Sequence, residues 1–405
     1  MIRKIPISDL QPGMFVVDVH KGWLDHLIWR RRFLVRDAAH VGKIRDNGIV
    51  EVSIDTDRGL DVPDKITPMA RLNAVEQKIT SLMDVKLALP RKVSLGEERR
   101  RASRLLTQAG DTVQDLMTSV RVGRDIDTGR LEPIVVKMIE SVMRNPDALV
   151  PLARMKQMNA YANEHAVATA ALIIALGRHE GVSDPELEKL ALGALLKDIG
   201  QAALDARLIA KPGALSRAEY SVVQSHVEEG LAVLEATSRL PELAVAVVLE
   251  HHERFDGTGY PYRLAAEDIS SAGRMASIVD TYDAMTSDRP FRAAVSPSLA
   301  LAQLFEESGR QFDPALVTAF VRTLGVYPVG TLVLLESGHL AVVDAINPEN
   351  SLAPMVRVIY HTARRQYIAP TMVDLSRRVG NHYGQIVRAE TYERWGLSPV
   401  RWQPA

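Results

Sequence analysis

The sequence of 405 residues contains no cysteine. This absence excludes a disulfide framework and any metal site built on thiolates, and it is typical of proteins in a reducing cytosol. If the chain holds a metal, the ligands must be histidine and carboxylate side chains. Such ligands suit Fe, Mn or Zn.

A strong net charge and long apolar segments are also missing. The 49 basic and 50 acidic side chains leave a formal net charge of −1, so no overall field favours a nucleic acid polymer or an anionic membrane. The most apolar stretches, 166–176 and 243–249, are too short to span a bilayer. The first residues lack the apolar region of a signal peptide. We therefore expect a cytoplasmic protein without membrane insertion.

The length allows two to four domains, and 46% hydrophobic and 24% charged residues are ordinary for a globular protein. Residues 1–63 indicate a small α/β domain, with β-branched segments of strand length at Met14–Val19 and Ile49–Asp55. Between them, Ala38–Asp46 has helical character and ends before Asn47-Gly48. We interpret this range as a sensory domain.

Two ranges of helical character follow. Residues 64–135 are polar, and we expect a helical linker in which the basic run Arg99–Arg101 is a solvated helix face. Residues 136–325 are rich in alanine, leucine and valine and predict an all-α domain. Its clearest apolar positions recur three and four residues apart, as on a buried helix face: Leu187, Leu190, Ala191, Ala194 and Leu195.

The pattern changes after residue 325. Thr331–Leu335 and Leu340–Ala345 flank a polar turn and predict a β-hairpin, and Met355–Tyr360 can add a strand. Residues 326–405 therefore indicate a β-rich C-terminal extension. Together the ranges predict an α+β multidomain protein with a small α/β N-terminal domain and a central all-α domain.

Histidine and aspartate in the all-α range are the candidates for chemistry. Five of the 11 histidines fall there: His165, His179, His226, His251 and His252. His179 is interpreted as a polar helix end. Three aspartates lie in similar apolar contexts: Asp198, Asp280 and Asp283. Each motif alone is weak, since a lone histidine on an apolar helix is more often a core residue, and the glycines near Pro261 can form a simple turn.

The order and context of the whole set are more specific. The run His-His-Glu-Arg-Phe-Asp-Gly-Thr-Gly-Tyr-Pro at 251–261, Asp-Arg-Pro-Phe-Arg at 288–292 and Phe312-Asp313-Pro314 resemble the HD-GYP family, bacterial phosphodiesterases of cyclic di-GMP. The likeness covers roughly residues 150–325 and implies an HD-type helical domain. Leu10–Met14 resembles a small domain of unknown function that often precedes HD-GYP domains.

The resemblance implies a centre of at least two divalent metal ions, Fe, Mn or Zn, and we expect one or two ions in this chain. Asp198 would bridge two ions in a two-metal in-line displacement at phosphorus. One ion would be held by His226, His251 and His252, and the other by His165 and Asp280.

The resemblance also implies substrate-binding residues. Tyr260 matches the tyrosine of the family's name motif, which lies near the substrate or a partner surface. Arg289 and Arg292 match positions where basic residues meet the phosphates of cyclic di-GMP, and a guanidinium fork fits phosphate well. The alternative for the two arginines is a pair of solvated surface charges.

The sequence departs from the family pattern at the His-Asp pair, which usually lies inside HDxGK. Here the stretch reads KDIGQ, with Lys197 in place of the histidine and Gln201 in place of the lysine. Lysine is ordinarily an ammonium without a lone pair. We expect one metal position to be weakened or empty. Alternatively, the Lys197 ammonium lies near that position and pairs with Asp198 and Asp280, or it points away without a role.

Gln201 and Tyr161 bear on activity as well. The Gln201 amide can donate a hydrogen bond but lacks the charge and the transferable proton of lysine. Loss of such a group commonly lowers a rate by about 10²–10³ where it acts on the transition state. Tyr161 stands where some relatives have a carboxylate that supports a third metal, so we do not expect a trinuclear centre.

These observations leave two functions open, with Asp198, Lys197 and Gln201 as the candidate catalytic positions. The first is a cyclic di-GMP phosphodiesterase whose activity is weak or lost. The second is a non-catalytic module that binds cyclic di-GMP or a protein, such as a diguanylate cyclase or another signalling protein. Hydrolysis of a different phosphoester is a third reading, which the GYP run disfavours.

Overall fold

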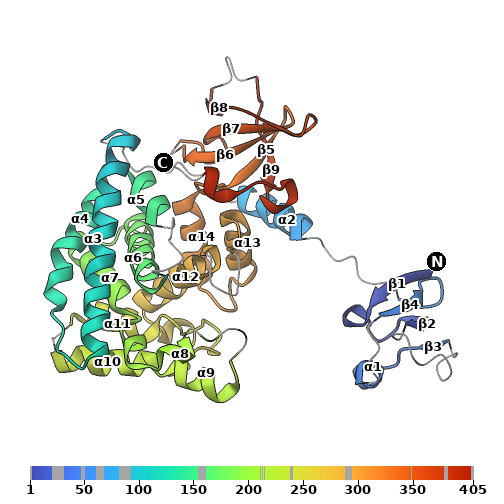
Figure 1. Cartoon of the computed structure of the whole chain (residues 1–405), viewed down its shortest axis with the longest axis horizontal. Coiled ribbons are helices and arrows are strands. Elements are labelled where there is room, and N and C mark those ends of the chain that lie inside the picture. The colour runs from blue at the N-terminus through green and yellow to red at the C-terminus, as the bar shows by residue number, and fades with distance from the viewer. Residues whose placement is uncertain are drawn as a thin grey trace. The chain divides into compact units, whose positions relative to one another are not determined.

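The computed structural model describes residues 2–20, 32–46, 51–60, 68–81, 93–153, 161–209, 211, 213, 215–237, 240–287, 294–347, 349–377 and 382–402. The chain divides into two compact units, 1–71 and 72–405 (Figure 1). Helices and two antiparallel sheets make it an α+β protein, as the sequence predicts. No helix among the described residues combines the length and apolar character needed to cross a bilayer.

The first unit is a four-stranded antiparallel sheet in the order β1-β4-β2-β3, with one helix. Its elements are β1 (Ile2–Pro6), the short 3₁₀ helix η1 (Ile7–Asp9), β2 (Phe15–His20), β3 (Phe33–Leu34), α1 (Ala38–Asp46) and β4 (Glu51–Asp55). Apolar residues such as Met14, Val16, Ile44 and Ile54 form its core. The predicted strands and the helix are confirmed as β2, β4 and α1, while 47–50 lie outside the described residues.

The second unit is mostly helical, and several of its helices contact one central helix, α6. The helices are α2 (Pro68–Ser81), α3 (Leu95–Arg121), α4 (Glu132–Arg144), α5 (Pro146–Ala153), α6 (Tyr161–His179), α7 (Asp184–Leu196), α8 (Ala206–Ile209), α9 (Arg217–Gln224), α10 (His226–Thr237), α11 (Glu242–Glu250), α12 (Ser271–Thr286), α13 (Pro297–Glu306) and α14 (Pro314–Leu324). The short 3₁₀ helices are η2 (Thr128–Leu131), η3 (Ile199–Ala203) and η4 (Ala266–Asp268). Residues 166–176 of α6 are all buried, because α3, α5, α7 and α12 pack around it.

α3 belongs to this helical body, although it lies in the range 64–135 that the sequence suggests as a linker. Its apolar stripe, which includes Ala102, Leu105, Ala109, Val113 and Leu116, is buried against α4, α5 and α6. This stripe has the spacing of a helix face that packs on a core.

Part of the basic run on α3 also differs from the expectation of a solvated face. Arg100 and Arg101 are exposed, but Arg99 is buried and donates a hydrogen bond of 2.9 Å to the backbone oxygen of Asp344. The expectation is wrong for Arg99, because the start of α3 packs against the C-terminal sheet and buries that side chain.

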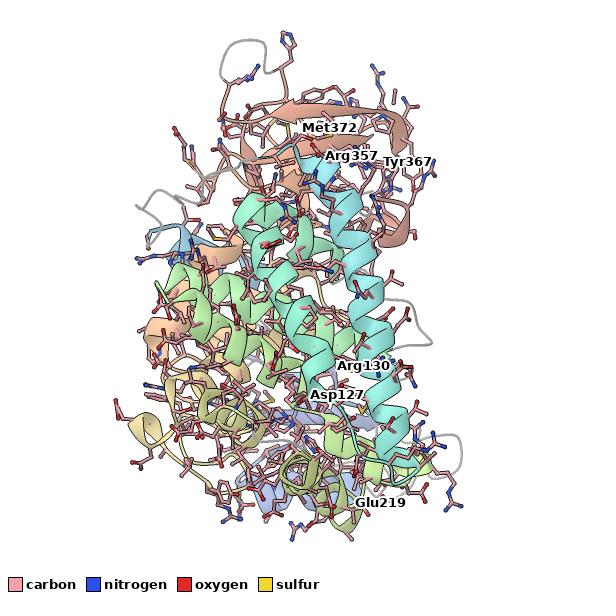
Figure 2. The ribbon with its side chains drawn as sticks, turned by 90° about the vertical axis from the view of Figure 1, so that its left-hand side faces the viewer. Asp127, Arg130, Glu219, Arg357, Tyr367 and Met372 are labelled. Atoms are coloured by element: carbon pink, nitrogen blue, oxygen red, sulfur yellow. The ribbon has the colours of Figure 1, made fainter. Side chains whose placement is uncertain are left out.

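The C-terminal sheet has five antiparallel strands in the order β8-β7-β6-β5-β9. They are β5 (Leu332–Leu335), β6 (His339–Ala345), β7 (Met355–His361), β8 (Gln366–Asp374) and β9 (Ile386–Glu390), followed by 3₁₀ helices η5 (Glu393–Trp395) and η6 (Pro399–Trp402). The predicted hairpin is confirmed in β5 and β6, and β7 is the additional strand. Figure 2 places Arg357, Tyr367 and Met372 of this sheet at one end of α3, and Asp127 and Arg130 toward the other.

Candidate metal centre

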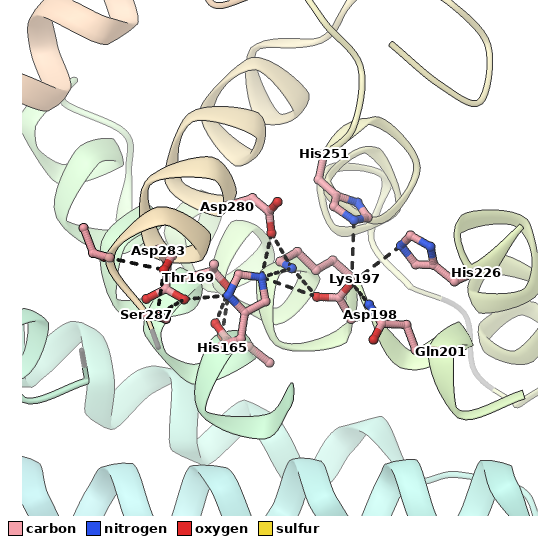
Figure 3. A network of polar contacts seen from close by, with 12 residues as sticks. His165, Thr169, Lys197, Asp198, Gln201, His226, His251, Asp280, Asp283 and Ser287 are labelled. Atoms are coloured by element: carbon pink, nitrogen blue, oxygen red, sulfur yellow. Dashed lines mark hydrogen bonds and ion pairs between the residues drawn. The ribbon is translucent and has the colours of Figure 1, made fainter. Parts of the chain in front are cut away.

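Histidine, lysine and aspartate side chains that lie in or beside several helices converge inside the helical body (Figure 3). His165 comes from α6, Lys197 directly follows α7, and Asp198 precedes η3. The other contributors are His226 at the start of α10, His251 and His252 after α11, and Asp280 in α12. The structure therefore brings together the six residues that the resemblance implies as metal ligands.

Gly200 allows η3 to approach α10. A Cβ atom on Gly200 would lie 2.0 Å from the backbone oxygen of His226 and 2.4 Å from the backbone nitrogen of Gly230. Only glycine avoids these clashes, because any other residue carries a Cβ. The contact brings Asp198, two residues earlier, next to His226.

Asp198, His226, His251 and His252 form a first group whose possible ligand atoms all lie within 4.8 Å of one another. The Nδ1 atoms of His226 and His251 lie 2.7 and 2.9 Å from the backbone oxygens of Val223 and Val248. Each Nδ1 therefore carries the proton and donates it, which leaves a lone pair on Nε2.

The Nε2 atoms of His226 and His251 accept no hydrogen bond within the described part of the chain. Both are buried without a hydrogen-bond partner there, and they lie 3.5 and 3.9 Å from Asp198 Oδ1. Burial, followed by the nearby Lys197 ammonium, lowers the pKa of His251 to about 4. A neutral imidazole with a buried free lone pair beside a carboxylate fits a divalent metal ion.

His165, Asp198 and Asp280 form a second group with the same spread of ligand atoms. Lys197, only 1% exposed, places its Nζ among them: 3.0 Å from His165 Nε2, 2.6 Å from Asp280 Oδ1, and in contact with Asp198 Oδ2. The second position is thus filled by an ammonium group (Figure 3). The group does not fit a second metal ion while Lys197 holds this place.

Lys197 and the two carboxylates stabilise one another in their charged forms. Burial alone would lower the pKa of Lys197, but Asp198 and Asp280 outweigh it and raise the pKa above its ordinary value. Burial alone would raise the pKa of each carboxyl, but Lys197 outweighs it and lowers the pKa of Asp198 and of Asp280. The lysine is therefore an ammonium without a lone pair for a metal. This matches the sequence-based alternative in which Lys197 pairs with both carboxylates.

Gln201 orients the shared carboxylate. Its Nε2 donates a hydrogen bond of 2.7 Å to Asp198 Oδ1, the oxygen that faces His226 and His251. The amide therefore acts on the position of Asp198 in this structure.

Asp283, a candidate from the sequence to which the resemblance gave no specific role, is a partner of the centre. Its Oδ2 lies 2.5 Å from His165 Nδ1, and the hydroxyl of Ser287 donates to its backbone oxygen at 2.6 Å. Thr169 donates at 2.9 Å to the backbone oxygen of His165. Asp283 follows Asp280 by three residues on α12, and this helical spacing is the signal that predicts a shared face.

The loop after His252 is held by a buried glutamate. The Glu253 carboxylate accepts backbone hydrogen bonds from Tyr262 at 2.7 Å and from Leu264 at 3.1 Å. The loop folds back so closely that a Cβ on Gly259 would lie 2.4 Å from the backbone nitrogen of Arg254. In this loop the Tyr260 ring stacks on the His252 ring, with centroids 4.6 Å apart and planes at 26°.

Other residues singled out from the sequence lie away from the centre or outside the described part. Arg289 and Arg292, with the whole run 288–293, lie outside the described residues, and so does the side chain of Tyr161. Asp313 caps α14, accepts from the backbone nitrogen of Ala315 at 2.8 Å, and pairs with Arg274 at 2.9 Å. These contacts give Asp313 a structural role.

Two family models match the chain. An HD domain matches residues 147–316, and a domain of unknown function, DUF3391, matches residues 2–131. The second match extends beyond the first compact unit and includes α3.

Curated relatives are similar to this chain in sequence over different lengths. A cyclic di-GMP phosphodiesterase of Pseudomonas aeruginosa is 37% identical over 98% of this chain and 94% of the relative. A cyclic di-GMP phosphodiesterase response regulator of Xanthomonas campestris is 36% identical over 35% of this chain and 38% of its own. A 3′3′-cGAMP-specific phosphodiesterase of Vibrio cholerae is 33% identical over 34% and 26%. With a relative this similar over nearly its whole length, the chain belongs to the HD-GYP family and carries a DUF3391 domain ahead of its HD domain.

Proposed function

We propose that this chain binds cyclic di-GMP at a centre with one divalent metal ion, and that it hydrolyses the nucleotide slowly or not at all. One observation carries the proposal: the Lys197 ammonium lies among His165, Asp198 and Asp280, while His226 and His251 keep free Nε2 atoms beside Asp198. One metal position is thus supported by its ligands and the other is taken by a side chain.

The first group would hold the ion, which is Fe, Mn or Zn by the chemistry of imidazole and carboxylate ligands. Asp198 is the anionic ligand, and Gln201 and Lys197 orient its two oxygens. His226 and His251 are directed by the backbone oxygens behind them. An ion bound here would neutralise charge on a phosphodiester.

Slow or absent turnover follows from what Lys197 and Gln201 lack. In a two-metal displacement both ions stabilise the attacking and leaving oxygens. An ammonium supplies one positive charge and has no open coordination position for an oxygen. The Gln201 amide has no proton to give to a leaving group, and a missing electrostatic group of this kind commonly costs about 10²–10³ in rate.

A working phosphodiesterase is the second candidate. It is favoured by the 37% identity, over 98% of this chain, to a protein named as a cyclic di-GMP phosphodiesterase. In that case the Lys197 ammonium would replace the electrostatic part of the second ion, and the remaining ligands would suffice for turnover.

The deciding experiment uses the full-length chain, stripped of metal by a chelator and reloaded with Mn²⁺. We would measure bound Mn per chain by elemental analysis, cyclic di-GMP affinity by calorimetry, and product by chromatography, with Asp198→Ala as control. We expect one ion per chain, nucleotide binding, and little or no product. Product formed over many turnovers per chain, and lost in Asp198→Ala, would establish the working phosphodiesterase instead, and absence of nucleotide binding would refute both candidates.

A further inference from the structure

A series of aromatic rings leads from the metal centre toward the surface. The ring of His252, in the first ligand group, stacks on Tyr260 at 4.6 Å. Tyr260 in turn meets the edge of Tyr220 at 6.4 Å and 78°.

Tyr220 is the outermost ring of the series, and it is not packed in the hydrophobic core. It is 47% exposed on α9, a helix without a buried residue. His252 and Tyr260, which stack on each other, are each only partly exposed, so Tyr220 is the most exposed ring of this series. An exposed aromatic side chain beside a candidate binding centre indicates a ligand contact more strongly than an isolated exposed aromatic residue elsewhere on the surface.

The helix that carries Tyr220 is nevertheless held in place. Ser216 and Glu219 form a capping box at its start, and Lys211 Nζ pairs with both Glu219 oxygens at 2.6 and 2.7 Å. Two residues after α9 ends, His226 enters the metal group. Tyr220 is therefore presented from a short helix joined directly to a metal ligand.

We propose that Tyr220 stacks on one guanine base of cyclic di-GMP while the attached phosphodiester lies at the metal centre. This inference rests on the proposed function and adds a residue for affinity. In cyclic di-GMP a single ribose separates each phosphate from a base. The ring series likewise starts at a candidate metal ligand, where the phosphate would lie, and runs outward to Tyr220, where the base would lie. Aromatic stacking tolerates any base, since every base has a π-face. Tyr220 thus strengthens binding of cyclic dinucleotides without selecting guanine over adenine.

The test compares Tyr220→Ala and Tyr220→Phe with a matched control, Val222→Ala, which removes another exposed apolar side chain from the same helix. Mn-loaded full-length proteins would be titrated with cyclic di-GMP, 3′3′-cGAMP and inorganic phosphate. For Tyr220→Ala we expect about tenfold weaker binding of both dinucleotides. Mn²⁺ and phosphate affinity should stay at the wild-type value. Tyr220→Phe and Val222→Ala should bind like the wild type.

Three results would overturn the inference, and they are distinguishable. Wild-type affinity of Tyr220→Ala for both dinucleotides would assign the exposed ring to another occupant, such as a protein partner. An equal loss of phosphate affinity would show that the substitution disturbs the metal centre itself. If the wild-type protein binds phosphate and Mn²⁺ but no dinucleotide, the proposed function fails and this inference fails with it.

Discussion

Lys197 changes how the charges of this centre are balanced. Its ammonium compensates Asp198 and Asp280, which are both buried. With a neutral histidine at the same position, the carboxylates would need a metal ion for the same compensation. We therefore expect the folded state of this chain to depend little on metal.

Replacing Lys197 by methionine tests that compensation. Breaking a buried ion pair by removing one partner typically costs about 3–5 kcal/mol, because the remaining charges stay buried. We expect Lys197→Met to lose about that much unfolding free energy in the presence of a chelator, measured by urea denaturation, and to regain part of it with Mn²⁺. Lys189→Met, an exposed lysine on the same helix, should change stability by less than about 0.5 kcal/mol. Equal effects of the two substitutions would contradict the role of Lys197.

Restoring the family residues tests the metal count. The double substitution Lys197→His, Gln201→Lys returns a neutral lone pair to the second group and a charged donor beside Asp198. We expect two Mn²⁺ ions per chain, with a spin-coupled pair visible by electron paramagnetic resonance, and a gain in cyclic di-GMP hydrolysis of about 10²-fold or more. Gln201→Lys alone should still bind one ion. A double variant that keeps one ion would show that Lys197 does not determine the count.

At the scale of elements, the centre depends on how closely η3 and α10 approach. Asp198 precedes η3, and His226 begins α10. The backbones meet at Gly200 and Gly230 without room for a Cβ on Gly200. Lengthening this contact by even a small amount would separate the carboxylate from the imidazole, because both ligands lie within two residues of it.

Gly200→Ala is the direct test of this contact. Overpacking of this kind typically costs about 1–3 kcal/mol, and we expect an additional loss of Mn²⁺ affinity because Asp198 moves away from His226. Gly110→Ala on α3, where a Cβ meets nothing within 4 Å, should leave Mn²⁺ affinity unchanged and raise stability by up to about 1 kcal/mol. Unfolding by urea and titration with Mn²⁺ would measure both. Wild-type metal affinity of Gly200→Ala would show that the approach of η3 is not critical.

At the scale of the whole molecule, α3 ties the helical body together and to the C-terminal sheet. Near its start, Arg99 donates to the Asp344 backbone oxygen at 2.9 Å, and Asp344 also pairs with Arg357 of β7 at 2.5 Å. The neighbouring Glu98 accepts from Ser141 at 2.7 Å and from Arg144 at 2.8 and 2.9 Å. Buried charges thus join elements far apart in the sequence.

This network makes the stability of the molecule sensitive to acid. Burial alone would raise the pKa of Glu98, but hydrogen bonds from Arg144 and Ser141 outweigh it and lower the pKa below its ordinary value of 4.5. A carboxyl with a lowered folded-state pKa stabilises the protein above its unfolded pKa, and this contribution disappears as the pH falls through the folded value.

We therefore expect Glu98→Gln to be less stable than the wild type by about 1–3 kcal/mol at pH 7. The difference should shrink steadily below about pH 4.5. Urea denaturation of both proteins between pH 3 and pH 7, without metal, measures the difference directly. A difference that stays constant over this range would mean that the charge of Glu98 does not stabilise the fold.

Local patterns determined much of this protein. The strands β2, β5, β6 and β7 follow from runs of β-branched residues and from polar turns, and the helix α1 follows from the helical character of its sequence before Asn47-Gly48. These patterns act within a few residues. The strands β8 and β9 were not predicted. Most of β8 is exposed, as is usual for an edge strand, and its sequence lacks a buried alternating face. A strand of that kind is defined by pairing with its neighbour, and pairing is a property of the folded chain.

The chemical residues divide in the same way. The order and context of the histidine and aspartate motifs carry the resemblance that implies the two candidate ligand groups, because residue types and local contexts are written in the sequence. The place of Lys197, the role of Asp283 and the burial of Arg99 were decided only by the tertiary structure. Each depends on residues more than 80 positions away that packing brings into contact. Sequence alone states which groups a chain carries, and the fold decides which of them share a site.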